Sequence, residues 1–332
     1  MLTTTAFAQE TVGADEELRD RALLQDDVPD GWRLSLKLGA SFSLVDSRAW
    51  VGSVEGSAFQ LGGLLETNAN YRSGPWESDT LLIVQHSQTR APPLDRFVKS
   101  NDTLELVNFL FYSFDSPDWA GAYLRLSLNT QVLAGDYVAS DTATVLVPDG
   151  AGGSTAETVD ADSPFELTKP FEPLTLRQTA GLFANPVVEK ALTIKLRAGV
   201  GAQETITRDG FVVADDETTA EIELAALSSL TQLGVEGDLS ATGELQEGVL
   251  SWLAAANIFA PFVSSDGDAD NGPNVDLRVG LSAKLSSWLS LDYLFQARRV
   301  PQVVDDWQRQ NTLLLTAGFD VVEPEPVPEP ES

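Results

Sequence analysis

From Trp32 onward, apolar and polar residues alternate one by one along many stretches of the chain. Residues 34–42, for example, read LSLKLGASF. A period of two places successive side chains on opposite faces of a β-strand. Several of these stretches are longer than the five or six residues that are usual for a globular strand. The pattern therefore predicts long strands that each have one apolar and one polar face.

Twelve strands are predicted in this way. Their approximate ranges are 32–44, 57–72, 76–88, 102–114, 120–132, 173–184, 190–202, 218–230, 248–262, 275–286, 288–298 and 310–322. The third strand is apolar on both faces at 81–84, and the stretch 231–247 fits either a strand extension or a long turn. The connectors alternate in length. Short turns are predicted at 73–75, 116–118, 185–186 and 286–287, and longer polar loops lie between them.

An even number of strands, with short turns at one end and long loops at the other, is typical of outer-membrane barrels. Tryptophans support this prediction, because amphipathic aromatic rings favour the headgroup level of a membrane. Trp32, Tyr71, Trp76, Trp119 and Trp288 fall at strand ends on the short-turn side. A soluble sandwich or lipocalin-like barrel is the alternative, and it would bury the apolar faces in a core. We expect an all-β protein with a single antiparallel up-and-down transmembrane barrel.

The ends of the chain differ from the alternating part. Residues 1–8 resemble the end of a secretory signal, which implies export, and residues 9–30 are expected to form a periplasmic segment. The barrel is expected over 31–322 and is followed by an acidic, proline-rich tail at 323–332. Location in a Gram-negative outer membrane follows from this organisation.

Composition narrows the possible chemistry. The 332 residues include 50 acidic and 21 basic side chains, a formal net charge of −29, so a nucleic-acid partner is not expected. Absence of cysteine removes thiolate catalysis and cysteine-bound metals, and the single histidine leaves little for imidazole ligation. No cofactor is expected. The partners expected are outer-membrane lipid and small solutes, and the acidity suits a high-salt habitat.

Several short motifs resemble an uncharacterised family of Gram-negative outer-membrane barrels that is known only as a domain of unknown function. They are GLL at 63–65, NANY at 68–71 with Trp76, RFVKSND at 96–102, PFEPL at 170–174, VDL at 275–277 and WLSLDY at 288–293. The resemblance covers most of 30–320, and the acidity and the tail depart from it. It implies the fold and the location, and it supplies no catalytic residues.

The polar strand faces are predicted to line the barrel interior. The charged residues predicted to face inward are Arg33, Lys37, Glu66, Arg72, Glu105, Arg125, Arg177, Lys195, Arg197, Glu221, Glu223, Arg278, Lys284, Asp292 and Arg298. Basic residues dominate this set, although the whole chain is acidic. Two hypotheses follow: a pore wall that favours anions, or a filled interior in which Arg–Glu pairs brace a narrow barrel.

Two weaker motifs carry candidate chemistry. His86 is the only conventional general base, and a lipid hydrolase would need it to pair with Ser87 or with a serine on a facing strand. Asp266, Asp268 and Asp270 alternate as in a calcium loop, but the glycine is displaced and the twelfth position lacks glutamate. Neither catalytic residues nor a metal site is therefore assigned.

The expected function is a narrow pore for small solutes, with a preference for anions. The alternatives are a non-conducting structural or surface-interaction barrel that acts through its acidic loops, and an outer-membrane lipid hydrolase. Conductance separates the first two, and lipid turnover would reveal the third. The loop at 133–172 is the largest insertion, and it is compatible with either an external position or a constriction of the pore.

Overall fold

A computed structural model describes residues 30–47, 56–90, 94, 96–150, 152–214, 219–265, 272–286, 289–300 and 304–322. The strands are β1 (Gly31–Ser47), β2 (Gly56–Ser73), β3 (Trp76–Arg90), β4 (Val98–Ser113), β5 (Ala120–Thr130), β6 (Gly135–Val138), β7 (Ala143–Pro148), β8 (Ser154–Val159), β9 (Pro164–Thr168), β10 (Leu174–Glu189), β11 (Leu192–Ile206), β12 (Phe211–Val213), β13 (Ile222–Ala226), β14 (Leu230–Leu245), β15 (Leu250–Ser264), β16 (Asn274–Ser286), β17 (Leu289–Val300) and β18 (Val304–Val322). One 3-10 turn spans Gln246–Gly248. Within the described ranges, no helix has the length and apolarity needed to cross a membrane.

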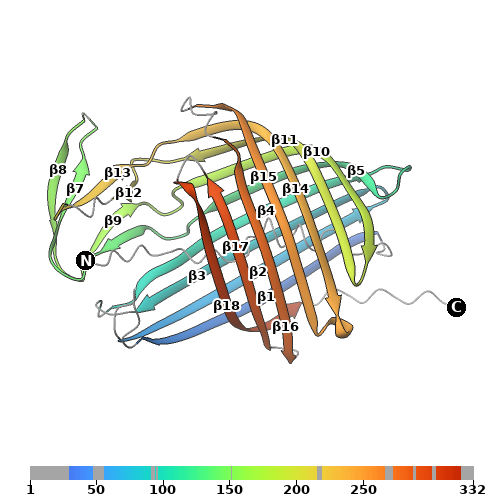
Figure 1. Cartoon of the computed structure of the whole chain (residues 1–332), viewed down its shortest axis with the longest axis horizontal. Helices are drawn as coiled ribbons and strands as arrows, with labels where there is room; N and C mark the ends of the chain where they lie inside the picture. The colour runs from blue at the N-terminus through green and yellow to red at the C-terminus, as the bar shows by residue number, and fades with distance from the viewer. Residues whose placement is uncertain are drawn as a thin grey trace.

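Twelve of the strands form a closed antiparallel barrel (Figure 1). Its order around the wall is β1-β18-β17-β16-β15-β14-β11-β10-β5-β4-β3-β2, so each barrel strand pairs with the next barrel strand along the chain. The first and last strands close the wall through pairs from Leu36↔Val322 to Ala40↔Ala317. The predicted fold class, an up-and-down barrel of about twelve strands, is confirmed.

The eighth barrel strand lies later in the chain than predicted. The range 218–230 holds only β13, which belongs to a separate sheet, whereas β14 crosses the barrel at Leu230–Leu245. The 3-10 turn at Gln246–Gly248 then joins β14 to β15. The sequence pattern implied a long connector over 231–247 at the short-turn end, whereas the connector between β14 and β15 in the structure is short.

The turn predicted at Asn185 and Pro186 is also wrong. Strand β10 continues through both residues to Glu189, and the register of its pairing with β11 shifts between Ala184 and Val187. Proline has no N–H to donate to a neighbouring strand and is tolerated in a sheet at such a bulge. The chain instead reverses between Glu189 and Leu192.

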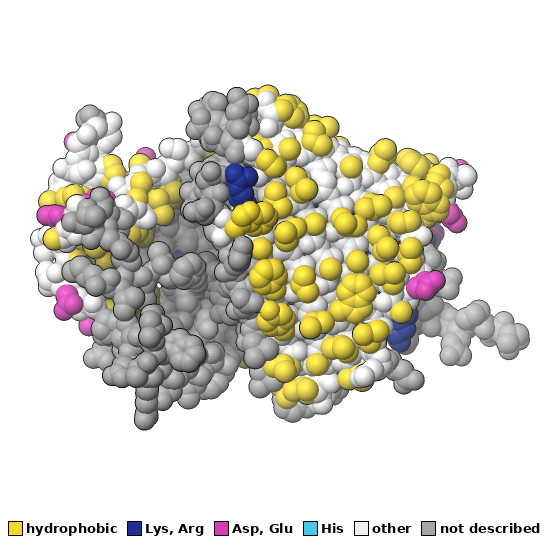
Figure 2. Space-filling view, in the orientation of Figure 1, with side chains coloured by type: hydrophobic (Ala, Val, Ile, Leu, Met, Phe, Trp, Pro, Cys, Tyr) yellow, Lys and Arg dark blue, Asp and Glu magenta, His cyan; other side chains and the backbone are white. Residues whose placement is uncertain are grey.

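The outer surface of the barrel wall is apolar. On β5, Leu124 and Leu126 are 50% and 51% exposed, whereas Arg125 between them is 2% exposed. Leu182, Val235 and Val279 are also exposed on other strands of the wall. Hydrophobic side chains spread over the whole visible wall (Figure 2). A soluble barrel would bury these faces, so their exposure places the wall in lipid.

A small β-sandwich lies beyond the loop end of the barrel, at the left of Figure 1. Strands β12, β13, β7 and β8 form one sheet, and β6 and β9 form a second. Val145, Val159, Ile222 and Leu224 are its buried core, and Phe165 packs against them. The loop predicted at 133–172 therefore folds into strands and contributes most of this sandwich. The loop between β11 and β14 contributes the rest.

Glu172 joins the two loops where they leave the barrel. Its side chain is buried, and its carboxylate accepts the backbone N–H of Arg208 from the second loop and that of Lys169 at 3.3 Å from the first. Gly210 packs so close to this carboxylate that a Cβ there would lie 3.1 Å from Oε1. This buried carboxylate thus ties the two loops together where they leave the barrel.

Replacing Glu172 with alanine is expected to loosen the sandwich without unfolding the barrel. The change removes the acceptor of two part-buried N–H groups, which costs about 1–3 kcal/mol and corresponds to roughly 5- to 160-fold more frequent opening. Limited proteolysis in detergent micelles should show faster cleavage within 131–173 and 207–229. Glu157→Ala on the exposed strand β8 is the matched control and should cleave at the parental rate. Equal cleavage of both variants would contradict the role of Glu172.

Candidate functional site: the interior of the barrel

The inward faces of one half of the wall are packed tightly together. On β14, the inward residues Gln232, Glu236 and Ser240 are buried, and they alternate with exposed Val235 and Leu239. The same alternation on β5, β10 and β11 brings polar and charged side chains into contact inside the barrel. A period-two sequence therefore builds a dry, polar interior on this half.

Glu236 is the centre of a buried charge network. Both nitrogens of the Arg125 guanidinium fork donate to the Glu236 carboxylate, each at 2.8 Å. Arg177 contributes a second guanidinium at 3.2 Å from the same carboxylate. The Thr179 hydroxyl donates at 2.6 Å and the Asn257 amide at 3.1 Å. A bidentate Arg–carboxylate pair with further donors is a rigid arrangement, so this network holds strands across the interior in fixed positions.

Aromatic side chains fill the space next to this network. Arg197 lies over the rings of Phe109 and Phe111, with distances of 4.7 Å and 5.8 Å from its guanidinium carbon to the ring centroids. Phe183 meets Phe111 edge to face at 5.3 Å. The guanidinium also lies 3.8 Å from a carboxylate oxygen of Asp238. Cation–π contact and ion pairing together explain how a fully buried arginine is accommodated.

The opposite half of the wall has an interior surface that solvent reaches. Most of its inward positions on β1, β2, β16 and β17 are of intermediate exposure, and they include small or polar residues such as Gly39, Asn70, Gly280 and Ser282, whereas Glu66 on β2 is buried. Asp292 accepts hydrogen bonds from the hydroxyls of Ser282 at 2.5 Å and Ser290 at 2.7 Å, within this layer. The interior is thus asymmetric, with a filled half and a solvated half.

The strand register determines where the predicted interior residues lie. Arg125, Lys195, Arg197, Glu66 and Glu105 are buried inside the barrel. The predicted residues that are more exposed at inward register positions are Arg33, Arg72, Arg177, Arg278, Lys284, Asp292 and Arg298. Lys37 occupies an inward register position opposite Glu66, and the structure does not describe its side chain.

The acidic partners inside the barrel differ from those predicted. Glu221 and Glu223 belong to the sandwich region, so the prediction that they face the interior is wrong. Further acids at inward register positions include Glu77, Asp79, Glu236, Asp238 and Asp276, and Asp320 lies opposite Lys37. Asp276, for example, pairs with Arg278 at 2.7 Å. The excess of basic residues inside the barrel is therefore smaller than the sequence implied.

Aromatic residues gather at the short-turn end on the outside of the wall. Trp32 and Tyr71 meet in a tilted arrangement at 4.9 Å between ring centroids, and Trp76 meets Tyr112 at 4.8 Å. Trp119 is half-exposed at the same end. Trp288 lies outside the described residues. This aromatic girdle borders an apolar wall with an even number of strands. Bacterial outer-membrane barrels have the same features, and the chain is an outer-membrane protein of this kind.

His86 does not pair with Ser87. The two side chains lie on opposite faces of β3: Ser87 is buried inside and contacts Ser100 at 3.0 Å, whereas His86 faces outward. The acid that faces His86 is Asp102, whose carboxylate oxygen lies 3.7 Å from Nδ1. Ser87, the serine adjacent to His86 in the sequence, therefore cannot serve as the nucleophile that the hydrolase hypothesis requires.

The calcium candidates Asp266, Asp268 and Asp270 lie outside the described residues. Within the described ranges, no group of three or more acidic or histidine side chains is arranged to hold a metal ion.

No protein-family model and no curated protein matches the sequence. Among solved structures, the chain is similar to the translocator domain of the autotransporter NalP from Neisseria meningitidis, with 10% identity, a TM-score of 0.40, and coverage of 95% of this chain and 99% of that one. An outer-membrane channel from Pseudomonas putida F1 has 11% identity, a TM-score of 0.41, and coverage of 89% and 98%. The toluene transporter TodX from P. putida has 11% identity, a TM-score of 0.33, and coverage of 88% and 90%.

Proposed function

We propose that this outer-membrane barrel is a narrow channel for small solutes. The observation that carries the proposal is the asymmetry of the interior. Buried charge pairs and aromatic rings fill the half built by β3 to β5, β10, β11 and β14, whereas solvent reaches the inward residues of β1, β2, β16 and β17. The braced half keeps the barrel open, and the solvated half provides the path.

The charges along the solvated half support weak selectivity. Arg278 is paired with Asp276, and Arg33 donates to the side chain of Asn70 close to Glu77. Paired charges inside a pore attract neither sign of ion strongly, because each cancels the field of its partner. We therefore propose passage of small solutes of either sign, with at most a mild preference for anions.

Enlarging an inward glycine on the solvated half should reduce conductance. Gly280 faces the interior, and a Cβ placed there meets Leu253 at 3.5 Å, which is ordinary contact. Gly280→Phe is expected to lower the single-channel conductance severalfold in planar bilayers, because the ring occupies the path. Gly237→Phe is the matched control, since Gly237 faces lipid and has nothing within 4 Å of its Cβ position; its conductance should stay parental.

Two results would contradict the proposal. Absence of step-like conductance in the parent protein would overturn the channel itself. Equal conductance in the parent and both glycine variants would show that the path does not follow the wall at β16.

A surface-interaction barrel is the second candidate. The sandwich has a hydrophobic core of its own, and β8 at its edge is exposed along most of its length. Passage of solutes does not require the loops to form a folded external domain of this kind. A parent protein without conductance would favour this function over the channel.

A further inference from the structure

A polar cluster on the outer face of the wall has no role in the channel. His86 lies on β3 at about the distance from Trp76 that a membrane strand needs to cross lipid, about 9–11 residues. Arg96 and Lys99 lie at the same end, at the start of β4. These side chains therefore stand at the outer headgroup level, where they face the lipid side of the wall.

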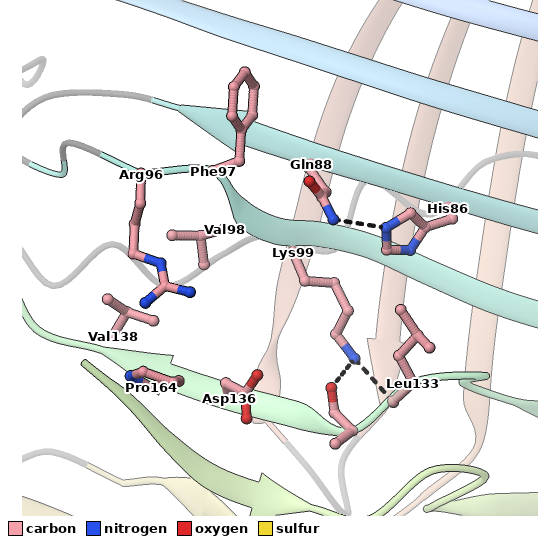
Figure 3. Close-up of a pocket in the computed structure, with 11 residues that line it drawn as sticks. His86, Gln88, Arg96, Phe97, Val98, Lys99, Leu133, Asp136, Val138 and Pro164 are labelled. Atoms are coloured by element: carbon pink, nitrogen blue, oxygen red, sulfur yellow. Dashed lines mark hydrogen bonds between the residues drawn. The ribbon is translucent and has the colours of Figure 1, made fainter. Parts of the chain in front are cut away.

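A cavity of about 260 Å³ lies between this part of the wall and the first segment of the sandwich (Figure 3). His86, Gln88, Arg96 and Lys99 come from the wall, and Asp136 comes from β6. In Figure 3, Arg96 and Asp136 point into the cavity from different sides. The cavity thus carries a donor and an acceptor that converge on one space.

The cavity is held in shape by Lys99. Its ammonium donates to the carbonyls of Leu133 at 3.1 Å and Ala134 at 2.7 Å, and to the side-chain oxygen of Gln131 at 2.9 Å. Asp102 accepts the backbone N–H of Leu133 at 2.6 Å. These bonds fix the segment that forms the far side of the cavity, so a ligand meets a preformed site.

Several N–H groups of the Arg96 guanidinium are available to a ligand. One nitrogen of its guanidinium donates to the carbonyl of Asp162 at 2.7 Å, and the group is otherwise exposed at the cavity. A guanidinium edge matches two oxygens of a phosphate. Leu133 lines the cavity and is 47% exposed, and Phe97 at its rim is 38% exposed, with its ring directed away from Arg96 and toward Phe59 at 5.8 Å. A cationic fork next to exposed apolar side chains suits an amphipathic anion.

From this combination we infer that the cavity binds the phosphate-bearing headgroup of an outer-leaflet lipid. The phosphate binds Arg96, a hydroxyl or ammonium of the headgroup donates to Asp136, and the start of the acyl region contacts Phe97 and Leu133. Free phosphate shares the first contact and lacks the other two. This inference does not depend on whether the barrel conducts.

Native mass spectrometry of the full chain in neutral detergent tests the inference, with EDTA present to remove bridging cations. The probes are a bis-phosphorylated glucosamine lipid, its dephosphorylated form, and inorganic phosphate. The phosphorylated lipid should bind, and Arg96→Gln should weaken that binding about tenfold or more, as expected for loss of charge-assisted hydrogen bonds. Arg208→Gln, an exposed arginine away from the cavity, should leave it unchanged.

A second variant separates the two sources of phosphate. Phe97→Ser should weaken binding of the lipid and leave binding of inorganic phosphate unchanged. Equal binding of the phosphorylated and dephosphorylated lipids would overturn the inference. So would a site at which inorganic phosphate competes as well as the lipid, or an Arg96→Gln variant that binds like the parent.

Discussion

Replacing Glu236 with alanine is expected to destabilise the barrel by about 3–5 kcal/mol, the usual cost of breaking a buried ion pair. Arg125 would then be buried, and Arg177 partly buried, without the carboxylate that both contact. Thr179 and Asn257 would lose their acceptor as well. Urea unfolding in detergent micelles, followed by tryptophan fluorescence, measures the change in the free energy of unfolding.

Two comparisons make this experiment specific. Glu244→Ala removes an acid from the same strand, but Glu244 and its partner Lys190 are exposed and 3.7 Å apart, so the expected cost is about 0–1 kcal/mol. The double variant Arg125→Met with Glu236→Leu replaces the central pair by apolar groups of similar volume, and it should be more stable than Glu236→Ala alone. A Glu236→Ala protein as stable as the Glu244→Ala protein would show that the network does not brace the barrel.

Placing an arginine on the outer face of β5 should have the next largest effect. Leu126 is half-exposed and lies near the middle of the crossing that begins beside Trp119. Leu126→Arg is expected to cost about 2–4 kcal/mol, because a charge at the bilayer midplane loses its hydration. Folding yield into lipid vesicles and the free energy of unfolding both report this cost.

The control places the same residue on a strand outside the membrane. Val212 on β12 is 46% exposed in the sandwich, where water can solvate a guanidinium. Val212→Arg should change the stability by no more than about 0.5 kcal/mol. Equal costs at the two positions would mean that the wall of the barrel does not face lipid.

The barrel could be predicted because lipid outside and polar contacts inside impose one rule on every strand: apolar and polar residues must alternate. That rule fails to identify β14, where Gly237 and Gly243 interrupt the apolar face. Ile222 and Leu224 alternate more cleanly nearby, but they build the sandwich instead. Alternation records only that one face is buried, and it does not distinguish a face that meets lipid from one that meets a small protein core.

The candidate site was predictable in part for a related reason. Arg125 and Arg197 sit in clean alternating strands, so their inward direction follows from sequence. Their partners Glu236 and Asp238 lie on β14, a strand that the sequence pattern places too early in the chain. The sequence therefore predicts an interior that is more basic than the observed one. The cavity at Arg96 depends on Lys99 reaching backbone carbonyls from a distant loop, and no local pattern encodes such contacts.

The way the sandwich is assembled has a consequence for how the protein holds its orientation. Strands β7 and β13 pair in parallel through Ile222↔Val145, although the whole β10–β11 hairpin lies between them in the chain. The sandwich can close only after both loops have crossed the membrane and that hairpin is in place, so it forms late. A folded body of this kind is then expected to keep the loop end of the wall on the side of the membrane where the sandwich formed.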